Sequence, residues 1–170
     1  MVRGITYKNQ IFKSSDFALM TKRFFNNQDG IIDGCTISTN ANNIIISSGY
    51  FIASGYYNNI TSDEIITAIN GTLVYEIDLS KENTDTEFNQ GKFKIINTSA
   101  RKDDLFKGGT IYQLEFATIT TDNNVASFEQ IIESVTKDFQ TQLNEKENKS
   151  TRGTVAPSGG KDGDRYFRYQ

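Results

Sequence analysis

Hydrophobic and polar positions alternate in short runs over most of the chain, and clusters of turn-forming residues separate the runs. The densest part is Gly30–Gly55, where three apolar runs, 31–37, 44–46 and 50–52, are divided by Thr39–Asn43 and by a Ser-Ser-Gly break. Period-two alternation bounded by turn residues is typical of strands. We therefore expect a β-meander here, and three strands alone must pack against the rest of the chain to be stable.

Further strands are expected on both sides of this stretch. Asn70–Gly71 is the strongest hairpin signal in the chain. It predicts that the strands before and after it, 60–69 and 72–79, pair with each other. Tyr56–Asn59, which precedes the first of these strands, is expected to be an exposed loop. Ile5–Phe12 is expected to be a strand or a tight hairpin around Lys8–Asn9, and Phe93–Ile96 and Thr110–Ile119 are further expected strands.

A short helix is expected over Asp16–Phe25. Ser14, Ser15 and Asp16 are suitable capping residues. The apolar residues that follow lie at helical spacing, which predicts an amphipathic helix of about three turns. We interpret the aromatic positions, Phe17, Phe24 and Phe25, as a face that packs on the core.

A second helix is expected from Ser127, a weak capping box with Gln130, to about Asn148. Its apolar positions alternate spacings of four and three, which is typical of a coiled-coil seam. An ordinary helix packed on its own domain is the alternative interpretation. The seam predicts an oligomer interface at Phe128, Ile132, Val135, Phe139 and Leu143.

The predicted fold class is mainly β, an antiparallel β-rich N-terminal domain with one short helix, a C-terminal coiled-coil-like helix and a short β tail. The predicted segments are residues 1–122, 123–150 and 151–170. The last contains a Gly/Pro linker and an aromatic strand, which predicts a partner-binding surface at Arg165, Tyr166, Phe167 and Tyr169. Asp162 and Asp164 are too few carboxylates for a calcium loop.

Composition narrows the classes of partner. The net charge is −3 and no long basic run is present, so nucleic acid is not expected to bind. No stretch of apolar residues is long enough to span a membrane. The first residues lead directly into a strand-like segment, so we expect no signal peptide.

Candidate catalytic chemistry is sparse. The chain has no His and one Cys, Cys35, which lacks the base that a nucleophilic thiol needs and is interpreted as a small buried hydrophobe. Asp63–Glu64 and Asp103–Asp104 are adjacent pairs, and adjacent strand residues point to opposite faces, so we interpret them as solvated charges. We expect neither an enzyme nor a need for a cofactor or a metal.

Several segments together resemble phage tail proteins. The resemblance rests on six segments and on their order along the chain. They are the opening ITYKNQIFKSSDF and FFNNQDGIIDGCTI, the strand ISSGYFIASG, the later strands GTLVYEIDLS and GGTIYQLEFATITT, and the closing GTVAPSGGKDGDRYFRY. This order is similar to that of the upper-baseplate and receptor-binding-protein connectors of Gram-positive phages and related prophage or tailocin clusters. The resemblance covers nearly the whole chain and includes no catalytic segment.

The resemblance implies a structural protein of the virion, made in the host cytoplasm, that joins the tail baseplate to receptor-binding machinery for host attachment. It also implies a homotrimer whose partners are other baseplate proteins and a receptor-binding protein. A carbohydrate-binding module for host cell-wall glycans is the alternative function, although the chain has no Trp. Its candidate stacking residues are Tyr50, Tyr56, Tyr57, Tyr166 and Tyr169.

Overall fold

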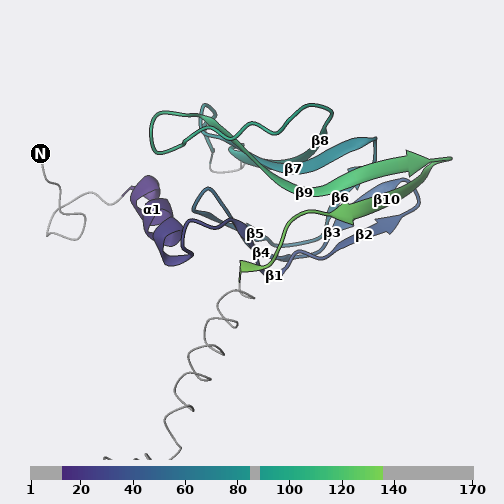
Figure 1. Ribbon diagram of the computed structural model, residues 1–170, viewed down its shortest axis with the longest axis horizontal. Coiled ribbons are helices and arrows are strands. Elements are labelled where there is room, and N and C mark those ends of the chain that lie inside the picture. The colour runs from purple at the N-terminus through teal and green to yellow at the C-terminus, as the bar shows by residue number, and fades with distance from the viewer. Residues whose placement is uncertain (1–12, 85–88, 136–170) are drawn as a thin grey trace, which may run out of the picture. The chain divides into compact units, whose positions relative to one another are not determined.

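The computed structural model describes residues 13–84 and 89–135, which contain one helix and ten strands in three antiparallel sheets (Figure 1). The prediction of a mainly β fold is therefore confirmed for this part of the chain. The elements are α1 Ser14–Phe24, β1 Gly30–Gly34, β2 Ile37–Asn40, β3 Asn43–Ile46, β4 Gly49–Ala53, β5 Tyr56–Ile60, β6 Glu64–Thr67, β7 Gly71–Asp78, β8 Gly91–Ile96, β9 Ile111–Asp122 and β10 Val125–Gln130.

Helix α1 confirms the short helix expected near the N-terminus. The Asp16 carboxylate accepts a hydrogen bond from the Lys13 backbone N–H at 3.0 Å, which caps the first turn. Phe17 is 52% exposed and Phe24 is 69% exposed, so the interpretation of these two rings as a core face is wrong. The buried residue of α1 is Ala18, and a Cβ at Gly55 would lie 2.4 Å from its carbonyl oxygen, so glycine at position 55 allows the helix to approach the turn between β4 and β5.

The stretch Gly30–Gly55 is divided between two sheets and is not the expected meander. β1 pairs with β4, whereas β2 and β3 form a hairpin that belongs to a different sheet with β6. Gly34 and Cys35, with φ angles of 61° and 53°, are two successive left-handed residues that end β1 and turn the chain out of the first sheet. The chain returns to the first sheet at β4, so the order there is β1-β4-β5.

The largest sheet has the strand order β10-β9-β7-β8. β7 pairs with β8 and with β9, whereas β6 pairs with β3, so the hairpin predicted at Asn70–Gly71 is wrong. These two residues instead carry the chain from one sheet to another. The side-chain oxygen of Asn70 accepts a hydrogen bond from the Thr121 backbone N–H at 2.7 Å and so ties the crossover to β9.

The hydrophobic core contains residues from all three sheets, with the largest sheet lying over the other two (Figure 1). Phe51 of β4 meets three rings of the largest sheet, with centroid distances of 4.7 Å to Tyr75, 5.9 Å to Phe93 and 5.2 Å to Phe116. Cys35 is fully buried, as expected, and burial together with the nearby Asp33 charge raises the pKa of its thiol to about 11.

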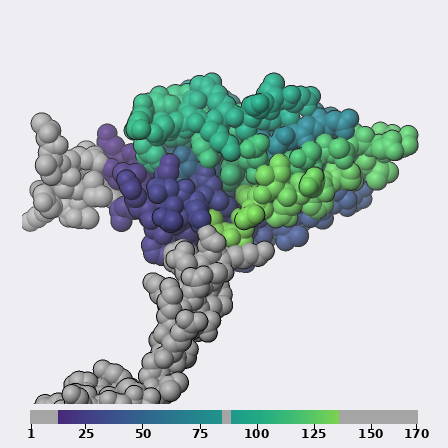
Figure 2. All heavy atoms as spheres, viewed as in Figure 1, coloured from purple at the N-terminus to yellow at the C-terminus, as the bar shows by residue number. Residues whose placement is uncertain are grey.

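Residues 131–135, here called the closing segment, return to the start of β1. The Ile131 and Ile132 backbone N–H groups donate to the Phe116 carbonyl at 2.9 and 3.1 Å, and the Ile31 N–H donates to the Glu133 carbonyl at 2.9 Å. Ser134 forms a parallel bridge with Ile31. Figure 2 shows β10 and the closing segment as a light green band along one face of the domain.

The helix predicted from Ser127 is wrong over residues 127–134, because β10 occupies Val125–Gln130, Ser127 pairs with Thr120 of β9, and Ser134 forms a bridge with Ile31. The boundary predicted between residues 122 and 123 consequently falls at the β9–β10 turn. The compact unit extends over Met1–Thr136, and the predicted helix beyond Val135 and the predicted tail lie outside the described residues.

Acid should destabilise this fold through a buried ion pair on β7. Burial tends to raise the pKa of Glu76, but hydrogen bonds from Lys94 and from Gln113, the latter 2.6 Å long, bring it below its usual value. A lowered pKa means that this stabilisation is present above 4.5, the usual pKa of a glutamate, and is lost as the pH falls through the lowered pKa. Asp103 also makes the fold less stable in acid, because its hydrogen bond from Arg101 lowers its pKa to about 2. Asp29 has the opposite influence on the pH dependence of stability, because burial raises its pKa.

The free energy of unfolding, measured by urea titration, should therefore fall from about pH 5 to pH 2. The isosteric variant Glu76→Gln should be less stable than the wild type at pH 6, and this difference should shrink as the pH falls through the range in which Glu76 is protonated. If the difference in free energy of unfolding between the wild type and Glu76→Gln stayed constant down to about pH 2, the charge of Glu76 would contribute nothing to stability.

Candidate functional site

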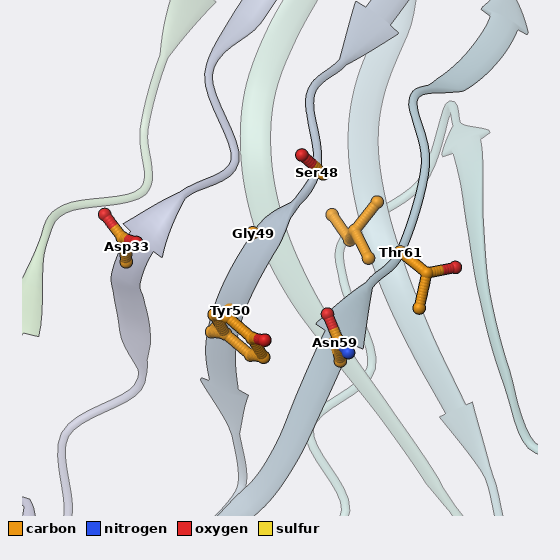
Figure 3. Close-up of a pocket in the computed structure, with 7 residues that line it drawn as sticks. Asp33, Ser48, Gly49, Tyr50, Asn59 and Thr61 are labelled. Carbon is orange, nitrogen blue, oxygen red and sulfur yellow. The ribbon is translucent and has the colours of Figure 1, made fainter.

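A row of polar and aromatic side chains crosses the outer face of the β1-β4-β5 sheet. Tyr50 of β4 is paired with Asp33 of β1 on one side and with Asn59 of β5 on the other (Figure 3). Paired residues of neighbouring strands lie on the same face of a sheet. Their neighbours Phe51 and Ile60 belong to the core, so the row faces outward.

These residues line a hollow of about 410 Å³. Its position at the ends of β1 and β5 and the start of β4 is visible in Figure 3. Most of the lining is polar, and none of the lining residues is basic. The complete lining is Asp33, Ser48, Gly49, Tyr50, Asn59, Ile60 and Thr61.

A second exposed ring extends the surface beside the hollow. Tyr57 lies two residues before Asn59 on the same face of β5, and its ring centroid is 5.5 Å from that of Tyr50 with an angle of 31° between the planes. Tyr50 is 38% exposed and Tyr57 is 50% exposed. Two neighbouring aromatic rings are therefore accessible to a ligand from the same side of the sheet.

A β-bulge places the carboxylate in this row. Ile31 pairs with Phe51 and Asp33 pairs with Tyr50, so Ile32 is the extra residue in β1. Without the bulge, regular pairing would place Ile32 instead of Asp33 opposite Tyr50, and bulges commonly redirect a side chain in this way. Gly49 allows the two strands to approach, since a Cβ there would lie 2.4 Å from both the Asp33 carbonyl oxygen and the Cys35 nitrogen.

The polar side chains of the row are open to solvent. Asp33, Tyr50 and Asn59 are all exposed. Within the part of the chain that the structure describes, their side chains take part in no hydrogen bond or ion pair. Their hydrogen-bonding groups can therefore bind a ligand without first breaking a bond inside the protein.

Three of the five residues predicted for the oligomer interface are used inside the domain instead. Phe128 pairs with Ile119 and packs against the core, and Ile132 and Val135 are only 5% and 4% exposed. The prediction of an open seam is therefore wrong for these three, because the chain from Val125 onward alternates as a strand before it reaches β1. Outside the described residues lie Phe139, Leu143, Arg165, Tyr166, Phe167 and Tyr169.

The tyrosines predicted to stack on sugars have different environments. Tyr56 is part of β5 rather than an exposed loop, its ring stacks on Phe106 at 6.2 Å, and burial raises its pKa. Tyr50 and Tyr57 are exposed and adjacent, whereas Tyr166 and Tyr169 lie outside the described residues. Asp33 and Asn59 were not predicted, since nothing in the sequence marks the bulge that aligns Asp33 with Tyr50 or the pairing of β4 with β5 that aligns Asn59 with it.

Among residues 13–84 and 89–135, no three side chains of His, Cys, Asp or Glu are grouped so that they could hold a metal ion. In the same ranges, no helix is both long and apolar enough to cross a membrane.

No protein-family model matches the sequence, and no curated protein is significantly similar to it. Function must therefore be argued from the order of the segments and from the geometry of the domain.

Proposed function

We propose that this chain is a structural, non-enzymatic protein of a phage-like tail, which connects the baseplate to receptor-binding proteins and so serves host attachment. The order of segments along the chain, which resembles that of upper-baseplate connectors, is the first support. A β domain followed by a C-terminal segment that carries the two remaining seam residues, Phe139 and Leu143, is the second support. In this proposal the protein belongs to the tail tip of the virion.

The observation that carries the proposal is the attachment of the closing segment to β1. A connector must hold the chain that leaves it firmly, because the parts that it joins move relative to each other during attachment. Here that chain is fixed by hydrogen bonds to Phe116 and Ile31 and by the buried side chains of Ile132 and Val135. A displacement of the chain beyond Val135 would thus be opposed by both sheets.

Mass spectrometry of tail particles tests the role. Particles purified by density gradient from an induced culture of the source organism should contain the chain in a constant ratio to the major tail protein across the gradient fractions. Tailless capsids from the same gradient should lack it. Finding the chain only in the soluble fraction, with none sedimenting with tails, would refute the proposal.

The assembly proposed is a homotrimer through the predicted helix, in which Phe139 and Leu143 are the predicted seam residues that lie outside the described residues. An isolated helix of this length is marginal in water, so its apolar positions need partners. The C-terminal Arg165, Tyr166, Phe167 and Tyr169 would then lie in three copies, available to a receptor-binding protein.

The double variant Phe139→Asp, Leu143→Asp should convert the trimer into monomers, because charges at seam positions would be buried against one another. Light scattering coupled to gel filtration measures the change, and the melting temperature of the β domain should be retained in the monomer. The control Gln140→Asp, Asn144→Asp adds the same charge away from the seam and should remain trimeric. A monomeric wild type at micromolar concentration would contradict the trimer.

A further inference from the structure

We propose that the outer face of the β1-β4-β5 sheet binds a neutral pyranose saccharide. Tyr50 and Tyr57 would form the stacking surface, and Asp33 and Asn59 would bind the hydroxyl groups of the sugar. This binding site goes beyond the connector role and does not depend on it. A tail protein and a protein of any other origin would bind sugar here by the same contacts.

The two exposed rings match the chemistry of a pyranose. A sugar ring has faces lined by C–H groups and an edge lined by hydroxyls, so it needs an apolar surface beneath and hydrogen-bonding groups around it. The faces of Tyr50 and Tyr57, 5.5 Å apart and tilted by 31°, supply the apolar surface. Tyrosine suits this position because it combines a large apolar area with a polar hydroxyl and few rotatable bonds.

The polar side chains beside Tyr50 lie where they can bind the hydroxyl groups of a sugar stacked on its ring. Paired residues on neighbouring strands have Cβ atoms about 5 Å apart, so Asp33 and Asn59 lie on either side of Tyr50 (Figure 3). A carboxylate can accept hydrogen bonds from two adjacent hydroxyls, and a carboxamide both accepts and donates. Thr61 and Ser48 add two hydroxyl groups at the rim of the hollow.

The size and shape of the hollow fit a short saccharide. Its volume of about 410 Å³ lies within the range of about 300 to 1,000 Å³ that is common for small-ligand sites. The hollow lies on an open sheet face, and the exposed ring of Tyr57, which is not part of its lining, lies beside Tyr50. One sugar unit can thus occupy the hollow while a neighbouring unit of the same chain contacts Tyr57.

The negative charge of the lining determines which class of saccharide the hollow favours. The lining contains the Asp33 carboxylate and no Lys or Arg. A phosphate, sulfate or carboxylate on the ligand would meet this negative charge with no cation to offset it. The site therefore favours neutral sugars over phosphate-bearing polymers of the cell wall.

Nuclear magnetic resonance tests the proposal on the full-length protein. The probes are the methyl glycosides of glucose, galactose, mannose and N-acetylglucosamine, with glycerol phosphate as the anionic probe. At least one neutral glycoside should shift backbone resonances saturably, and the shifts should be confined to the Asp33 region, 48–50 and 57–61. Glycerol phosphate should cause no saturable shift.

Variants locate the binding. Tyr50→Ala should weaken it at least tenfold, or by about 1.4 kcal/mol, and Tyr57→Ala and the isosteric Asp33→Asn should also weaken it. Phe17→Ala is the matched control, because Phe17 is an exposed ring on α1 outside this row, and it should leave the affinity unchanged. Asp33→Asn keeps the shape of the side chain, so it tests the contribution of the carboxylate to sugar affinity even if an alanine variant does not fold.

Three results would overturn the proposal. The first is the lack of saturable shifts with every neutral glycoside at tens of millimolar. The second is an affinity that Tyr50→Ala and Asp33→Asn do not change. The third is a set of shifts at Tyr50 and Tyr57 that depends on protein concentration in the absence of sugar, which would show that this face binds a second copy of the chain.

Discussion

Replacing Phe51 by alanine should lower the free energy of unfolding by about 3 to 5 kcal/mol, the range typical of a buried phenylalanine. Phe51 is 1% exposed and extends from β4 to the rings of Tyr75, Phe93 and Phe116 in the largest sheet. The substitution would leave a cavity between the layers and remove three aromatic contacts at once. Urea unfolding at neutral pH, followed by circular dichroism, measures the loss.

The neighbouring residue offers a matched control. Tyr50→Ala also removes an aromatic ring from β4, but that ring is 38% exposed on the outer face, so we expect a loss of about 1 kcal/mol or less. Similar losses at the two positions would mean that the layers are not joined through Phe51. Phe51→Leu, which fills most of the volume, should recover more than half of the stability.

Replacing Gly30 by alanine should release the closing segment and cost about 2 to 4 kcal/mol. Gly30 has a φ angle of 155°, and a Cβ there would lie 2.5 Å from the Glu133 carbonyl oxygen and 2.8 Å from a methyl group of Val135. Backbone atoms cannot move aside cheaply, so the hydrogen bond from Ile31 to Glu133 should break. Hydrogen exchange of the Ile31 and Ile132 amides should accelerate, whereas amides between β7 and β9 should stay protected.

Gly108→Ala separates steric conflict from backbone strain. Gly108 also has a positive φ angle, 90°, but a Cβ there would meet nothing within 4 Å. Its substitution should therefore cost only about 1 kcal/mol and leave the closing segment protected. If Gly30→Ala left the exchange of Ile31 and Ile132 unchanged, the closing segment would not be held by β1.

The sequence predicts the elements of this fold better than their pairing. Local signals are enough for α1, where the acidic cap and the helical spacing agree, and for β7, where alternation is regular. Pairing depends on contacts between distant residues. Asn70–Gly71 has the composition of a hairpin turn, yet Asn70 bonds to Thr121, fifty-one positions along the chain, and β6 pairs with β3.

The error at Ser127 has a related cause. Phe128, Ile132 and Val135 are spaced by four and three, which fits a helix, but Ala126 and Phe128 also fit a strand whose alternate residues face the core. β9 is long enough to pair along β10, and this pairing decides between the two patterns. A pattern of two or three apolar residues cannot make that choice by itself.

The candidate site was predictable only in part. The tyrosines at 50 and 57 are visible in the sequence as possible stacking residues, and the structure brings these two together. Asp33 and Asn59 are far apart in sequence. Asn59 shares a face with Tyr50 through the regular pairing of β5 with β4, whereas Asp33 does so only because Ile32 forms a bulge. A bulge shifts the alternation by one residue, and no residue type is specific for it at this position.

The measurement that tests the connector proposal most directly is electron microscopy of purified tails labelled with an antibody fragment raised against residues 13–135. We expect labels gathered at the tail tip, arranged around the tail axis in multiples of three. Labels distributed along the tail tube, labels on the capsid, or particles that carry no label while the soluble protein binds the fragment would contradict it.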